Sequence, residues 1–120
     1  MTDLDVDEAD HGEVAVLVLR GELDLATVPS LRDRLLDVVR THRSVILDLA
    51  GLGFLDSTGL GLLVSAVKRL QERDGTLVVA APSPAVVRLL EVSGLDAHLV
   101  VSESSEAALE ALAGPARDGR

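Results

Sequence analysis

The sequence lacks cysteine, tryptophan and tyrosine, and its only aromatic residue is Phe54. Without cysteine there are no disulfides, thiolate zinc sites, iron–sulfur clusters or cysteine nucleophiles. Without tryptophan and tyrosine, the usual platforms on which nucleic-acid bases stack are missing. We therefore expect a protein that uses no metal and no cofactor and does not bind nucleic acid directly.

A long apolar run and a basic, apolar N-terminus are also missing. A signal peptide requires both a basic start and an apolar stretch, and a membrane-spanning helix requires about 20 apolar residues in succession. The expectation is therefore a soluble, cytoplasmic protein with no membrane partner.

The net charge of −9 is spread unevenly along the chain. Residues 1–10 contain five acids and no base, whereas residues 11–100 contain eleven acids and nine bases. Residues 3–8 alternate acids with Leu4 and Val6, which predicts a half-exposed strand whose charges discourage edge-to-edge association. We expect a monomer for that reason.

Apolar periodicity predicts strands that alternate with helices. The expected strands cover residues 3–8, 14–19, 44–49, 77–81 and 98–101. The expected helices cover residues 28–41, 57 to about 74, 84–93 and 104–112, with Thr27, Ser83 and Ser104 as N-caps. This order favours an α/β fold, a single domain with a mixed open sheet of four to five strands and about four helices.

A search for catalytic motifs finds none. The histidines His11, His42 and His98 are scattered, and the glycines at 51, 53, 59 and 61 form neither a dinucleotide fingerprint nor a P-loop. Asp24, Asp48 and Asp56 form a carboxylate cluster only if the fold brings them together, and Asp48, inside an apolar strand, is expected to have a structural partner. We therefore predict no catalytic residues and no enzyme.

The most informative stretch is Phe54-Leu-Asp-Ser-Thr-Gly-Leu-Gly61. It leaves a buried strand and enters a helix, at the edge of α/β sheets where ligands and partners bind. Asp56, Ser57 and Thr58 are capping residue types, and the structural interpretation is a helix cap alone. Gly59 and Gly61 have no side chains, so another surface can approach the backbone of the first helical turn closely.

Three segments together resemble the bacterial anti-sigma factor antagonists, the small STAS-domain proteins. These segments are Gly21-Glu22-Leu23-Asp24, Asp56-Ser57-Thr58-Gly59-Leu60-Gly61 and the stretch Ser83-Pro84-Ala-Val-Val-Arg-Leu-Leu-Glu-Val-Ser-Gly-Leu95. They lie in the family's order at plausible separations. Leu55 stands where methionine would also be expected, a mild departure. The resemblance implies a STAS domain, which we place over residues 1–113. Residues 114–120, at the end of the chain, are expected to form a disordered tail.

The resemblance also implies a function in bacterial transcription regulation, of the kind used in stress response and sporulation. The unphosphorylated protein would bind an anti-sigma factor that is also an ATP-dependent serine kinase, and so free a sigma factor. The kinase would phosphorylate Ser57 and abolish binding, and a serine/threonine phosphatase would restore the active form. The partner-binding residues carried over are Asp24, Asp56, Thr58, Gly59, Leu60 and Gly61.

Two alternatives remain. One is a STAS module that binds a partner within a scaffold or transporter-associated complex without switching, and the other is a small hydrolase using Ser57, which lacks a base. Phe54 lies three residues before Ser57, and we expect it to anchor the loop in the core, so that Phe54→Ala would lower stability.

Overall fold

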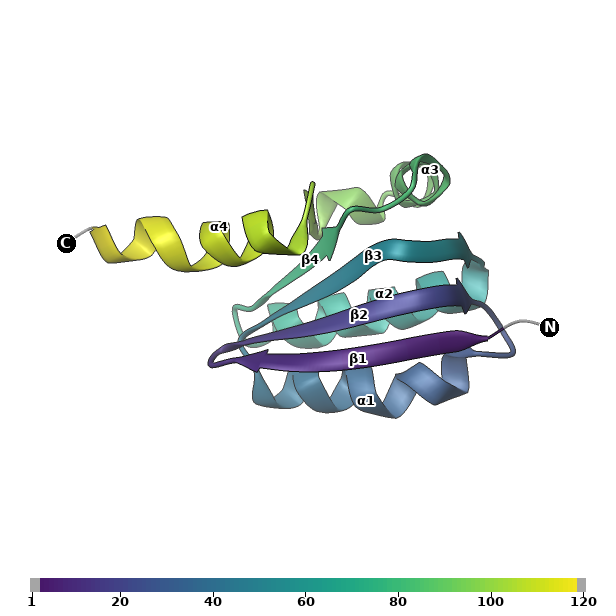
Figure 1. The fold of residues 1–120 in the computed structure, drawn as a ribbon, viewed down its shortest axis with the longest axis horizontal. Coiled ribbons are helices and arrows are strands. Elements are labelled where there is room, and N and C mark those ends of the chain that lie inside the picture. Colours follow the sequence, from purple (N-terminus) through teal and green to yellow (C-terminus); the bar gives the residue numbers. More distant parts are fainter. Residues whose placement is uncertain (1–2, 119–120) are drawn as a thin grey trace.

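The computed structural model describes residues 3–118, and the side chains of residues 3–113. Their backbone forms a five-stranded sheet with helices on both faces (Figure 1). The elements in chain order are β1 (Leu4–His11), β2 (Val14–Leu23), α1 (Val28–Thr41), β3 (Ser44–Leu55), α2 (Ser57–Gln71), β4 (Thr76–Ala80), α3 (Pro84–Ser93), a 3-10 turn (Leu95–Ala97), β5 (Val100–Ser102) and α4 (Ser105–Asp118). The strands are arranged in the order β1-β2-β3-β4-β5. The predicted element order and fold class are confirmed.

The two faces of the sheet carry separate apolar clusters because side chains alternate along a strand. Ala15, Leu17 and Leu19 of β2 point into the larger cluster, which also contains the apolar stripes of α1, α2 and α3. Val14, Val16 and Val18 point to the other face, where α4 contributes Ala108 and Leu112. In Figure 1, α1 and α4 lie on opposite sides of the sheet. Strands β2 to β5 are parallel, and β1 pairs antiparallel with β2.

Strands β2 and β3 are longer than the sequence predicts. They were expected to end at Leu19 and Leu49, but they stay paired as far as Leu23 and Leu55, through the segment expected to be a loop. At two points in the pairing, β3 contains one residue more than the stretch of β2 opposite it. Extra residues of this kind are β-bulges, and they let a glycine-containing segment continue as a strand where the apolar pattern breaks down.

The helix predictions hold with changes at the ends. The hydroxyl of Ser83 accepts the backbone N–H of Val86, and Gly94 ends α3 in the left-handed conformation, as expected. Thr27 stands at the N-cap of α1, but its hydroxyl donates to the carbonyl of Glu22 at 2.8 Å instead of capping. The helix α2 ends at Gln71, earlier than predicted.

The last helix and strand also differ from prediction at their ends. The hydroxyl of Ser104 accepts the N–H of Ala107 at 3.0 Å, as its predicted capping role requires. Helix α4 then continues to Asp118, so most of the segment 114–120 that was expected to be disordered is helical, and residues 119–120 lie outside the described range. Strand β5 spans residues 100–102, two residues later than predicted at its start.

The acidic strand β1 lies at one edge of the sheet, as its alternation predicts. Its carboxylates Asp5 and Asp7 lie 3.4 and 2.8 Å from the guanidinium of Arg20 on β2. The hydrogen bond from Arg20 to Asp7 and the negative charge of that carboxylate raise the pKa of Arg20.

No helix in the described part of the chain is long and apolar enough to cross a membrane.

Candidate functional site

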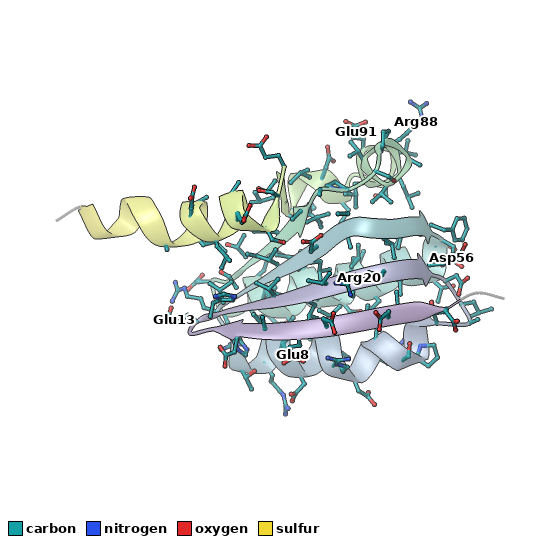
Figure 2. The ribbon with its side chains drawn as sticks, viewed as in Figure 1. Glu8, Glu13, Arg20, Asp56, Arg88 and Glu91 are labelled. Carbon is teal, nitrogen blue, oxygen red and sulfur yellow. The ribbon has the colours of Figure 1, made fainter. Side chains whose placement is uncertain are left out.

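Two of the motifs meet at the carboxyl ends of β2 and β3. Leu23 pairs with Leu55 in the sheet, and the N–H of Asp56 donates to the carbonyl of Leu23 at 3.2 Å. The segment Gly21–Asp24, whose first three residues are the end of β2 and not the expected turn, therefore lies beside the start of α2, although the two segments are far apart in the sequence. Figure 2 places Asp56 at this end of the sheet.

The carboxylate of Asp56 joins the two loops. Its Oδ1 accepts the N–H of Gly59 at 2.9 Å, which is the predicted N-cap of α2. Its Oδ2 accepts the N–H of Leu25 at 3.1 Å, from the loop between β2 and α1. The sequence predicts the cap but not the bridge, because nothing local connects residues separated by 31 positions.

Asp24 organises the other loop. Its Oδ1 accepts the N–H groups of Ala26 and Thr27 at 3.0 and 3.1 Å, and it lies 3.2 Å from the hydroxyl of Thr27. Short polar side chains stabilise turns in this way. Asp24 is half-buried, so its carboxylate holds the shape of the surface next to Asp56.

Ser57 is the first residue of α2, and its side chain is exposed. The first N–H groups of a helix have no partner within the helix, and together with the helix dipole they favour a negative charge at this end. A phosphate on Ser57 is therefore compatible with the folded domain.

The two glycines of the motif differ. A Cβ on Gly61 would meet nothing within 4 Å, so this position leaves the backbone of the first turn open. Gly59 is buried, and a Cβ there would lie 2.6 Å from Leu55 and 2.9 Å from Leu23. The interpretation that both glycines let a partner approach is therefore wrong for Gly59, which packs inward. Thr58 and Leu60 are half-buried beside it.

Phe54 does not enter the core, contrary to prediction. Its side chain is 48% exposed, and Leu25 on the neighbouring loop is 73% exposed. In the part of β3 that follows Asp48, the buried positions are Leu49, Leu52 and Leu55. This spacing of three arises because the bulges insert extra residues, and it turns Phe54 to the surface. Phe54 lines a shallow pocket of about 210 Å³ with Val86 and Leu89 of α3.

Leu25 was not singled out from the sequence. The available signal is a large apolar residue isolated in a turn, directly after Asp24. Leu25 and Phe54 both lie near Asp56, the N-cap of α2, and add exposed apolar surface there, which is characteristic of a contact surface.

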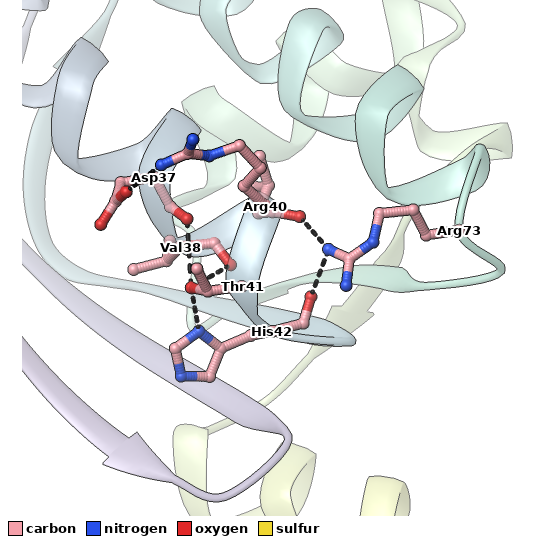
Figure 3. Close-up of polar contacts among 7 residues, drawn as sticks. Asp37, Val38, Arg40, Thr41, His42 and Arg73 are labelled. Atoms are coloured by element: carbon pink, nitrogen blue, oxygen red, sulfur yellow. Dashed lines mark hydrogen bonds and ion pairs between the residues drawn. The ribbon is translucent and has the colours of Figure 1, made fainter.

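The other polar candidates do not join the site. Asp48 accepts from the hydroxyl of Ser105 at 2.7 Å and from the N–H of Ala50 at 3.0 Å, which confirms a structural partner. The ring nitrogens of His42 lie within hydrogen-bonding distance of Thr41 and Asp10. Arg73 donates to the carbonyls of Val39 and His42 at the end of α1 (Figure 3). Among the described residues, no three histidine or acidic side chains are grouped to hold a metal ion.

The double role of Asp56 gives a testable prediction. Asp56→Ala removes the cap of α2 and the bridge to Leu25, and we expect a loss of about 2 kcal/mol in the free energy of unfolding. The control Ser83→Ala removes only a cap, with an expected loss of about 1 kcal/mol. Urea denaturation measures both losses, and amide exchange at Leu25 should accelerate only in Asp56→Ala. Equal losses with unchanged exchange at Leu25 would contradict the bridge.

Comparison with known proteins confirms the family resemblance. The STAS domain family model matches residues 5–108. The anti-sigma-B factor antagonist of Staphylococcus epidermidis is 34% identical over 105 residues, which cover 86% of this chain and 96% of that protein. An anti-sigma factor antagonist from Mycobacterium paratuberculosis has a similar structure, with a TM-score of 0.82 at 30% identity over 91% of this chain and 93% of that one.

The similarity of fold extends further. The Bacillus cell fate determinant SpoIIAA in its phosphorylated form aligns with a TM-score of 0.73 at 24% identity, over 92% of this chain and 99% of that one. At that identity the likeness concerns the fold.

Proposed function

The chain belongs to the STAS-domain family and, within it, to the anti-sigma factor antagonists, and from this membership we propose that it acts by partner switching. In its unphosphorylated form it binds an anti-sigma factor that is an ATP-dependent serine kinase, and the sigma factor is released. Phosphorylation of Ser57 by that kinase ends the binding, and a serine/threonine phosphatase restores it. The protein acts as a monomer in the cytoplasm, as substrate and regulator and not as an enzyme.

The observation that carries this proposal is the setting of Ser57. Its hydroxyl is exposed at the first residue of α2, as a phosphoacceptor must be. Leu25, which is bound through its N–H to Asp56, and Phe54 at the end of β3 provide exposed apolar surface nearby, and exposed aromatic residues are common at the centres of protein interfaces. The surface offered to a partner therefore consists of the start of α2, the loop after β2 and the end of β3.

Phosphorylation weakens the binding of a partner to this surface through the negative charge that it adds. A phosphate adds a charge of about −2 beside the carboxylate of Asp56, with Asp24 on the neighbouring loop. The N–H groups at the start of α2 accommodate that charge in the free protein. A partner that packs closely over Ser57 must remove water from the phosphate. This weakens binding by roughly 100-fold or more when the partner places no basic side chain against the phosphate.

Incubation with ATP and an anti-sigma factor kinase from the same organism tests the proposal. We expect one phosphate on Ser57, none in Ser57→Ala, and unchanged labelling in the matched control Ser65→Ala, a serine further along the same helix. Calorimetry should show binding of the kinase to the unmodified protein and a loss of roughly 100-fold after phosphorylation. Phosphate on Thr58 would contradict the residue assignment. Absence of phosphate with binding retained would instead identify a module that does not switch.

The same samples show whether the switch is local. Because the helix terminus accommodates the phosphate without rearrangement, amide NMR shifts should change around Asp24, Asp56 and the first turn of α2. Shift changes across β4 or α4 would contradict a local electrostatic switch.

A further inference from the structure

The pocket beside Phe54 extends the surface around Ser57 as far as α3. It has a volume of about 210 Å³ and lies between the end of β3 and the start of α3. The residues that line this Phe54 pocket are Gly53, Phe54, Leu55, Ala85, Val86 and Leu89. None of them has a charged or hydrogen-bonding side chain, so the group that fills the pocket is apolar.

The inner wall of the pocket is fixed by regular structure. Leu55 and Val86 are both buried. Leu55 pairs with Leu23 where β2 and β3 end, and the N–H of Val86 donates to the capping hydroxyl of Ser83 at 3.3 Å. A pocket that is already formed needs little ordering when a side chain enters it, and this favours affinity.

The rim of the pocket is open to solvent. Phe54 and Ala85 are exposed, and Leu89 is half-buried. In Figure 2, α3 lies at the same end of the sheet as Asp56. An exposed aromatic side chain beside an apolar pocket is typical of the centre of a protein interface, where a side chain of the partner fills the pocket.

The pocket lies within the area that a protein acting on Ser57 covers. Phe54 is three residues before Ser57, so their Cα atoms are at most about 11 Å apart. A stable interface covers about 800 Å² on each partner, which corresponds to a circle with a radius of about 16 Å. A kinase centred on Ser57 therefore also covers Phe54 and the mouth of the pocket.

We propose that the Phe54 pocket receives one large apolar side chain of the anti-sigma factor kinase that phosphorylates Ser57. This inference rests on the proposed function, because it concerns the same partner. The pocket contributes affinity and selects among kinases, whereas Ser57 contributes the switch. A kinase with a charged or polar side chain at this point is rejected, because that group would lose water without gaining a hydrogen bond.

The pocket acts on the binding of the kinase and not on phosphoryl transfer. Phe54→Ala removes one wall and should raise the KM for this protein as the kinase's substrate by roughly tenfold, with kcat unchanged. Phe54→Leu keeps an apolar wall and should raise the KM by less than roughly threefold. A loss in kcat instead would place Phe54 in the transfer step.

Ala85→Glu tests the pocket from the side of α3. Ala85 is the second residue of that helix, where a negative charge favours the helix, so the variant should fold. The apolar side chain of the kinase would then enter beside a carboxylate and remove water from it. The KM should therefore rise by roughly tenfold or more, again with kcat unchanged.

Two substitutions outside the pocket are the matched controls. Val100→Ala removes a large apolar side chain on β5 that is 49% exposed, close to the exposure of Phe54. Ala111→Glu adds the same charge at an exposed position of α4. Neither residue lines the Phe54 pocket, so both variants should have the KM of the unaltered chain. Thermal unfolding shows that each variant is folded.

The experiment uses the full chain, ATP and an anti-sigma factor kinase from the same organism. Initial rates of Ser57 labelling give KM and kcat for each variant, and calorimetry with the kinase gives the affinity. Methyl NMR of the complex identifies the occupant. We expect intermolecular contacts from the methyl groups of Val86 and Leu89 to one apolar side chain of the kinase.

The failure of the pocket and the failure of partner switching give different results. Unchanged KM and affinity in Phe54→Ala and Ala85→Glu, with normal labelling of Ser57, would overturn the pocket alone. Weakened kinase binding in both variants, with no phosphate on Ser57 of the unaltered chain, would support the pocket and contradict switching. Neither binding nor phosphate in the unaltered chain would contradict both.

Two further results would overturn the pocket. One is an equal rise of KM in the controls Val100→Ala and Ala111→Glu, because the effect would then not depend on the pocket. The other is a dimer in analytical ultracentrifugation that Ala85→Glu dissociates, because the occupant would then be a second copy of this chain.

Discussion

Gly59→Ala is expected to lower the free energy of unfolding by about 2 kcal/mol, although alanine is the better helix former. The new Cβ would lie 2.6 Å from Cδ1 of Leu55, 2.9 Å from Cγ of Leu23 and 2.9 Å from the carbonyl oxygen of Leu23. Both leucines are buried, and they pair with each other where β2 and β3 end. Because the contact includes backbone, a change of rotamer cannot relieve it, and the start of α2 must move away from the sheet.

Gly61→Ala provides the matched control two residues along the same helix. Its Cβ meets nothing within 4 Å, so only the helix propensity changes and a gain of about 1 kcal/mol is expected. Urea denaturation measures the free energy of unfolding of both variants, which should fall in Gly59→Ala and rise in Gly61→Ala. A stabilising effect at both positions would show that Gly59 is not required by packing.

The variants Gly59→Ala and Gly61→Ala also separate two roles of the motif, which are packing against the sheet and access for the kinase. If the kinase approaches the open backbone at Gly61, Gly61→Ala should slow phosphorylation of Ser57 without loss of stability. Gly59→Ala should slow it together with a loss of stability, because the first turn of α2 is displaced. Thermal unfolding and initial rates of labelling, measured on the same samples, distinguish the two effects.

Gly21→Ala is expected to cost about 2–3 kcal/mol. Gly21 has a φ of +113°, which alanine rarely adopts, and a Cβ there would collide with the carbonyl oxygen of Asp3. That carbonyl accepts the N–H of Glu22 at 2.9 Å. The substitution therefore strains the backbone and pushes the start of β1 away from the end of β2 that leads to Asp24.

Gly12→Ala is the control for the backbone conformation alone. Gly12 also has a positive φ, +75°, but a Cβ there would meet nothing within 4 Å, so the expected cost is about 1 kcal/mol. Urea denaturation compares the two costs. Amide exchange at Glu22 should accelerate only in Gly21→Ala, and equal costs with unchanged exchange would exclude the close approach of Asp3.

Helix positions were predictable because their signals are local. The apolar spacing of Val28, Leu31, Leu35 and Val38 identifies α1 and its buried face without reference to the rest of the chain. Ser83 followed by Pro84 identifies the start of α3 in the same way. Helix hydrogen bonds and caps join residues that are close in sequence, so the sequence contains what is needed to place them.

The ends of β2 and β3 were not predictable because each strand depends on its partner. Residues 50–55 resemble a loop, with two glycines and no clear alternation. They form a strand because β2 pairs with them through two bulges. The same bulges turn Phe54 outward, so an aromatic residue expected in the core becomes part of the contact surface.

The sequence by itself determined the order of elements, the α/β class, the position of Ser57 at the start of a helix and the family, because these follow from local periodicity, capping and motif spacing. Only the tertiary structure decided that Asp56 bridges two loops, that Gly59 packs inward and that Leu25 and Phe54 face solvent. These features depend on contacts between β2 and β3 and between residues 31 or more positions apart, such as Leu25 and Asp56, and such contacts exist only after the strands have paired.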